Sequence, residues 1–103
     1  MGLRDRPTYE LERIKALMRS PGGWTVTKTA QFEAARLGFD DSTILECVLA
    51  LTGDCFYKTM PSEKASGLWQ DVYHPVVDDV VLYVKLQISQ DGRLAVVIQF
   101  KEK

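Results

Sequence analysis

Residues 80–101 read VVLYVKLQISQDGRLAVVIQFK, with apolar side chains at every second position on both sides of an Asp-Gly pair. A period of two is the pattern of β-strands, and Asp-Gly is a common turn pair. The stretch therefore predicts a hairpin of strands Val80–Ser89 and Leu94–Lys101. For the apolar residues of both strands to share a face, we expect a three-residue loop, Gln90–Gly92, with a left-handed glycine.

This register places polar side chains on the other face of the hairpin. Tyr83 would lie opposite Gln99 and diagonal to Lys101, within reach of long side chains. Two further runs, Phe56–Met60 and Leu68–Tyr73, are rich in β-branched and aromatic residues and are also expected to be strands.

One register of those two strands would put a lysine opposite a glutamine in the centre of an apolar patch. The loop between them, Pro61–Gly67, does not fix the register. If this register is correct, four polar side chains converge on one sheet face: Lys58, Gln70, Tyr83 and Lys101. A sheet does not need this combination, whereas a reaction on a phosphodiester does.

The first half of the chain has helical periodicity instead. The predicted elements are a helix over Pro7–Arg19, a short extended piece at Trp24–Val26, a helix capped by Thr27 or Thr29 and ending at Gly38, and a helix that begins at Asp40–Ser42 and ends near Gly53. Helices followed by strands indicate an α+β domain. We expect the N-terminal helices to pack on an antiparallel sheet formed mainly by the C-terminal half.

Length and composition fit one small soluble domain. The chain has 103 residues, and no stretch approaches the roughly 18 apolar residues of a membrane span. Met1–Arg6 leads into no apolar segment, so we expect no secretory signal and a cytoplasmic protein. Cys47 and Cys55 lack metal-ligand spacing, which predicts reduced packing residues rather than a disulfide or a zinc site.

The net charge argues against tight nonspecific binding of nucleic acid. Thirteen basic residues against 14 acidic ones give −1, whereas phosphate-backbone binders usually have a basic excess. A few lysines in a groove of low dielectric constant can still bind a phosphate locally.

Several blocks together resemble the motility quorum-sensing regulator (MqsR) family of type II toxins over the whole chain. They are Phe56–Met60, Trp69–Tyr73 followed by Pro75, Tyr83–Lys85 and Phe100–Lys103. The resemblance implies one RelE-like toxin domain over residues 1–103 and a sequence-preferring endoribonuclease that cuts mRNA and arrests growth. It also implies a cognate MqsA-type antitoxin that binds zinc and, through a helix-turn-helix, DNA, so that the toxin would contact DNA only indirectly.

Carried over to this chain, the catalytic residues proposed for the family fall on Lys58, Gln70, Tyr83 and Lys101. The residues expected to contact RNA are His74, Lys85, Gln99 and Lys103. No metal or cofactor is expected, because RNA carries its own nucleophile, the 2′-hydroxyl.

The expected chemistry leaves the acid and the base open. Lys58 and Lys101 would stabilise the phosphorane, and Gln70 would orient the phosphate or a base edge. Tyr83 would be the general acid or base, with its pKa lowered by the lysines, although a desolvated lysine could be the base instead.

Plainer interpretations exist for each residue. Single lysines often protect edge strands, and Tyr83 alone would be a packing residue. Trp69 and Tyr73 are expected to fill the core. His74 is expected to lie in the loop His74–Asp79 between the second and third predicted strands of the C-terminal half. A non-catalytic binding module of the same fold, acting through antitoxin or ribosome contact, is therefore the alternative function.

Overall fold

The computed structural model describes residues 5–103; Met1–Arg4, most of the segment in which no secretory signal is expected, lies outside the described residues. Three helices and a 3₁₀ turn precede most of the strands. In chain order the elements are α1 Leu11–Arg19, β1 Trp24–Val26, α2 Lys28–Ala35, α3 Asp41–Leu49, η1 Gly53–Cys55, β2 Phe56–Pro61, β3 Trp69–Tyr73, β4 Val76–Val77, β5 Val80–Ile88 and β6 Ala95–Glu102. None of these helices is long and apolar enough to cross a membrane.

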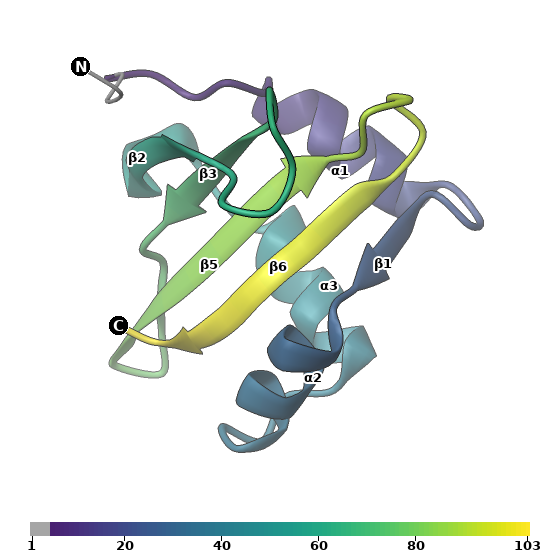
Figure 1. Ribbon diagram of the computed structural model, residues 1–103. Coiled ribbons are helices and arrows are strands. Elements are labelled where there is room, and N and C mark those ends of the chain that lie inside the picture. The colour runs from purple at the N-terminus through teal and green to yellow at the C-terminus, as the bar shows by residue number, and fades with distance from the viewer. Residues whose placement is uncertain (1–4) are drawn as a thin grey trace.

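The strands form one sheet in the order β1-β6-β5-β3-β2, with the helices against one of its faces (Figure 1). The predicted α+β class is confirmed, but the sheet is mixed rather than wholly antiparallel. Strand β1 pairs with β6 in parallel, with Trp24 opposite Ala95. The other face carries no helix layer, and we call it the open face.

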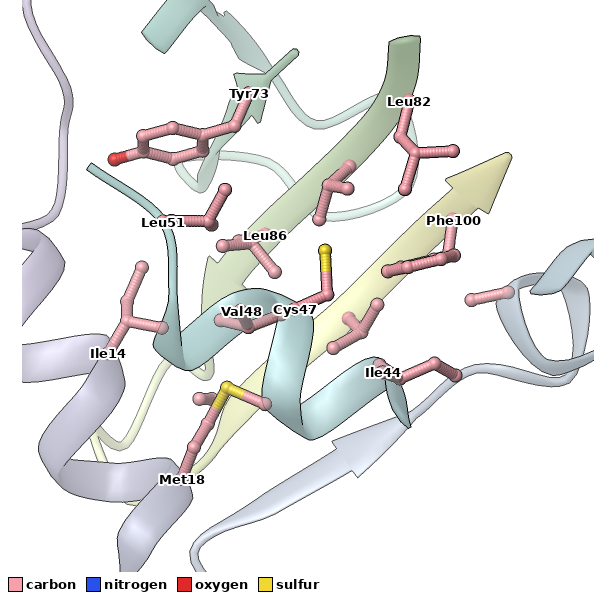
Figure 2. Packing of buried hydrophobic residues seen from close by; sticks show 14 of the residues in the cluster. Ile14, Met18, Ile44, Cys47, Val48, Leu51, Tyr73, Leu82, Leu86 and Phe100 are labelled. Atoms are coloured by element: carbon pink, nitrogen blue, oxygen red, sulfur yellow. The ribbon is translucent and has the colours of Figure 1, made fainter. Parts of the chain in front are cut away.

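The hydrophobic core lies between the helices and the sheet (Figure 2). Ile14, Ile44 and Val48 from the helices meet Leu86 and Phe100 from the strands, and all five are at most 1% exposed. Burying a side chain of this size contributes about 1.5–3 kcal/mol. Both cysteines are free thiols, and burial raises the pKa of Cys47 to about 11.

Helices α2 and α3 begin where the sequence predicts, whereas α1 begins later than predicted. Thr27 caps α2 by accepting a hydrogen bond from the Ala30 N–H, and Asp40 forms a capping box with Thr43. Helix α1 begins at Leu11 rather than at Pro7 because the preceding backbone has another partner. The N–H groups of Thr8 and Tyr9 donate to the buried carboxylate of Asp71 at 3.0 and 2.9 Å.

The third helix and the predicted loop after β3 also differ from expectation. Helix α3 ends at Leu49, and the single 3₁₀ turn η1 follows it instead of a continuous helix to Gly53. The region expected to be a loop contains β4, which pairs with β5. Asp78 and Asp79 both adopt positive φ, 51° and 67°, as the turn between these strands requires.

The predicted register of the β5–β6 hairpin is wrong, although Gly92 has the expected left-handed conformation, with φ 76°. Tyr83 pairs directly with Lys101, not with Gln99. The loop is Gln90–Arg93 instead of the expected Gln90–Gly92, because the Ser89 N–H donates to the Leu94 carbonyl and Ile88 pairs with Ala95. The register shifts again between Lys85 and Leu86, where Ile98 is the extra residue on β6. Because of this bulge, the buried residues of β6 are Ala95, Val97 and Phe100 rather than the strictly alternating set.

The β2–β3 register also differs from the one considered. Lys58 lies opposite Val72, and Met60 lies opposite Gln70. A second bulge, between Phe56 and Lys58, leaves Tyr57 without a partner on β3.

Candidate functional site

The strand pairing places all four predicted catalytic residues on the open face. Residues that pair directly, or that are two apart on one strand, share a face of the sheet. Tyr83 pairs with Lys101, and Val72 pairs with both Lys58 and Lys85. Gln70 is two residues before Val72, so it faces the same way.

Two ammonium groups lie against the ring of Tyr83. The Lys101 Nζ is 5.1 Å from the ring centroid and the Lys85 Nζ is 5.7 Å from it. Both distances are in the range of cation–π contacts. We call Tyr83, Lys85 and Lys101 the lysine–tyrosine cluster.

An aromatic row links this cluster to Lys58. The His74 ring stacks on Tyr57 at 4.2 Å between centroids and lies 5.8 Å from the ring of Tyr83. The Lys58 Nζ is 5.5 Å from the centroid of Tyr57. Rings and cations therefore form one continuous surface from Lys58 to Lys101.

The structure separates Gln70 from this surface. Its side chain is 9% exposed, and its Nε2 donates to the Oε1 of Gln87 at 3.0 Å. The amide therefore faces a cavity beside the cluster rather than the phenol.

Burial and neighbouring charges shift the pKa values in the cluster. The pKa of Tyr83 is raised, first by burial and then by Tyr57 and Glu33, which contradicts the expected lowering by lysines. The pKa of Lys85 is lowered, first by burial, while Glu63 opposes that shift and Lys101 adds to it. At neutral pH Tyr83 is thus a neutral phenol that can donate a proton.

The predicted RNA contacts divide into two groups. His74 and Lys85 lie among the rings and cations, and the charge of Lys103 reaches His74 and lowers its pKa, after burial as the largest cause. Gln99 differs, because its Nε2 donates to Glu33 at 3.2 Å. The same carboxylate accepts the N–H of Phe100, so Glu33 on α2 anchors β6.

Sequence reasoning missed Tyr57, Gln87 and Glu33. Strict alternation puts Tyr57 on the face opposite to Lys58, and only the bulge turns its ring onto His74. Gln87 has the parity of Tyr83 and Lys85, and that pattern could have drawn attention to it.

Comparison with known proteins assigns the chain to a class of small toxins that act with a partner protein. The family described as "Motility quorum-sensing regulator, toxin of MqsA" matches residues 6–102. A relative, the mRNA interferase toxin MqsR of Escherichia coli (strain K12), is 30% identical over 97 residues, which are 94% of this chain and 95% of the relative. The chain belongs to the motility quorum-sensing regulator toxin family.

Proposed function

We propose that this protein is a toxin endoribonuclease, an mRNA interferase, whose site is the lysine–tyrosine cluster. The observation that carries the proposal is the approach of Lys101 and Lys85 to 5.1 and 5.7 Å from the Tyr83 ring, on an open face and in a chain of this family. A non-catalytic binding module is disfavoured, because the relative is named for an enzymatic activity.

The reaction is attack of the RNA 2′-hydroxyl on the adjacent phosphorus. The new O–P bond forms as the bond to the 5′-oxygen breaks, giving a 2′,3′-cyclic phosphate and a 5′-hydroxyl. Lys58, Lys85 and Lys101 supply positive charge to the phosphorane, an effect of about 3 kcal/mol per well-placed group. The 2′-hydroxyl proton passes to a solvent water. A neutral phenol suits the general acid, so Tyr83 protonates the leaving oxygen and regains its proton from solvent.

Two tyrosine variants test this assignment. Tyr83→Phe should lower kcat on an RNA oligonucleotide by about 10²- to 10⁴-fold, the usual contribution of a general acid. Tyr73→Phe is the matched control, because its buried hydroxyl lies on the helix side of the sheet and has no hydrogen-bond partner within residues 5–103. Equal rates for the two variants would remove Tyr83 from the mechanism.

The lysines have a separate test. Lys101→Met should lower kcat more than it raises KM, because the developing charge is greatest in the transition state. Lys28→Met, at the exposed start of α2, should change neither constant. A change confined to KM would reassign Lys101 to substrate binding.

We propose His74, Lys85 and Lys103 as RNA contacts and an antitoxin related to MqsA as the protein partner. That the antitoxin binds zinc and carries the DNA contact is likewise part of the proposal. Co-purification with the product of the neighbouring reading frame tests the partnership. One hydrophobic core shared by helices and strands supports a single RelE-like domain over residues 1–103.

A further inference from the structure

A cavity of about 430 Å³ opens on the same face beside the lysine–tyrosine cluster. It lies between the start of α2, the loop after β2 and strands β5 and β6. Its volume falls within the roughly 300–1,000 Å³ of small-molecule sites. Lys85 lines the cavity and also contacts the Tyr83 ring, so the cavity and the cluster adjoin.

Two linked amides face this cavity. The hydrogen bond from Gln70 to Gln87 uses one amide hydrogen and one oxygen of the pair. No other side-chain hydrogen bond of either residue exists within residues 5–103, so the Gln87 Nε2 keeps both hydrogens and the Gln70 Oε1 keeps its lone pairs. The pair therefore offers a donor and an acceptor side by side.

The loop that forms one wall is itself held in place. The Ser62 Oγ accepts the N–H groups of Lys64 and Ala65, and the Ser62 N–H donates to the carbonyl of Leu68 at 2.8 Å. Met60 and Ile98 add apolar surface to the lining. The cavity is thus a built pocket with apolar side chains and, on the linked amides, one free donor group and one free acceptor within residues 5–103.

The chemistry of the lining favours a nucleobase over a phosphate. A phosphate only accepts hydrogen bonds from amides and would face the lone pairs of the Gln70 Oε1. Glu63, Lys64 and Lys85 also line the cavity, so charge does not select the ligand and the choice rests on the amide pair. An unstacked base presents both donors and acceptors on one edge and an apolar ring face, as RNA-binding proteins read it.

We propose that this cavity is the base-recognition subsite of the nuclease. It holds one nucleobase next to the scissile phosphate, and Gln87, together with Gln70, hydrogen-bonds its edge. Gln87 then determines specificity, and Gln70 reads the base rather than orienting the phosphate. This inference rests on the proposed function, because the base belongs to the RNA that is cut.

The test is the cleavage preference of the full chain on an RNA pool with randomised sequence, read by sequencing the products. Gln87→Leu should reduce discrimination at a single nucleotide position by about three- to tenfold, the effect of one hydrogen bond. Rates at disfavoured sequences should stay the same. Gln87→Glu keeps an acceptor for Gln70 but has no donor, so it should change which base is preferred at that position.

Gln90→Leu, at an exposed position in the β5–β6 loop, is the matched control and should preserve the preference. Circular dichroism melts establish that each variant folds, and Gln87→Glu decides the matter if Gln87→Leu does not.

Several outcomes would overturn the inference. An unchanged preference in both Gln87 variants would refute the subsite while leaving the nuclease intact. Equal loss at all sequences would make Gln87 a positioning residue. An unchanged preference with weaker antitoxin binding would assign the cavity to the antitoxin. A wild-type chain that cuts no RNA would refute the proposed function and this inference together.

Discussion

Replacing Asp71 with alanine should release the N-terminal segment from the sheet. The Asp71 carboxylate is fully buried on the helix side and accepts the N–H groups of Thr8 and Tyr9. Hydrogen bonds to a charged group contribute about 1.5–3 kcal/mol each. Because both bonds are only partly buried, the freed N–H groups can turn to water, and the expected loss is about 3 kcal/mol. Asp71→Asn keeps one acceptor and should lose about half of that.

Urea unfolding measures this loss. With a slope of about 2 kcal/mol per molar for a domain of this size, Asp71→Ala should lower the midpoint by about 1.5 M. Glu46→Gln, an exposed position on α3, should leave it unchanged. In a chain that starts at residue 10 the donors are gone, so Asp71→Ala should cost nothing there. An equal loss in the long and the short chain would refute the reasoning.

The same variant separates structure from chemistry in the Trp69–Tyr73 block. Asp71 faces the helices, whereas Gln70 faces the cavity. Asp71→Asn should therefore keep the wild-type kcat on RNA at a temperature where it is folded, and a selective loss of kcat would place Asp71 in the reaction.

Two further predictions concern backbone packing and titration. Gly23→Ala should destabilise the fold by about 3 kcal/mol in thermal unfolding, because its Cβ would meet the Leu17 carbonyl oxygen at 2.1 Å. Gly53→Ala is the control and should be neutral, because a Cβ there meets nothing within 4 Å. Similar losses of stability in the two variants would contradict this account of the packing. Burial, Lys103 and Lys58 hold the pKa of His74 below its usual value, so the imidazole should stay neutral at pH 7 and an NMR titration should show its pKa rising in Lys103→Met but not in Lys28→Met. An unchanged pKa in Lys103→Met would show that this lysine does not act on the ring.

Much of the fold could be predicted because local signals and the core agree. The two strands within residues 80–101, the Thr27 and Asp40 caps and the extended piece at Trp24–Val26 all appear in the structure. The parallel pairing of β1 with β6 could not be predicted, because three residues carry no signal for their partner strand. Neither could the late start of α1, which depends on a carboxylate more than 60 residues away.

Loop lengths and the two bulges together account for the errors in register. The loop Gln90–Arg93 is one residue longer than expected, and this residue together with the extra one at Ile98 brings Lys101 directly opposite Tyr83. The bulge at Tyr57 turns that ring onto His74. Neither bulge, at Tyr57 or at Ile98, contains glycine or proline, the residues that mark irregular strands in a sequence. The shared face of the four predicted residues was nevertheless correct, because the two one-residue shifts in β6 add to two and restore the phase of Lys101 with Tyr83. Lys58 likewise lies two positions away from its expected partner, opposite Val72 instead of Gln70, so it keeps its face.

Net charge, by contrast, is a poor guide to what this face can bind. The value of −1 averages over surfaces that a bound RNA strand would not touch, such as the exposed Asp41 and Glu46 on α3. On the open face, the charges of Lys58 and Lys103 both lower the pKa of His74, and those of Lys58 and Lys101 both lower the pKa of Lys85. His74 and Lys85 therefore each experience two cations at once. A phosphate entering that field would relieve the mutual repulsion of the lysines, so local binding is favoured even though the whole chain is slightly acidic.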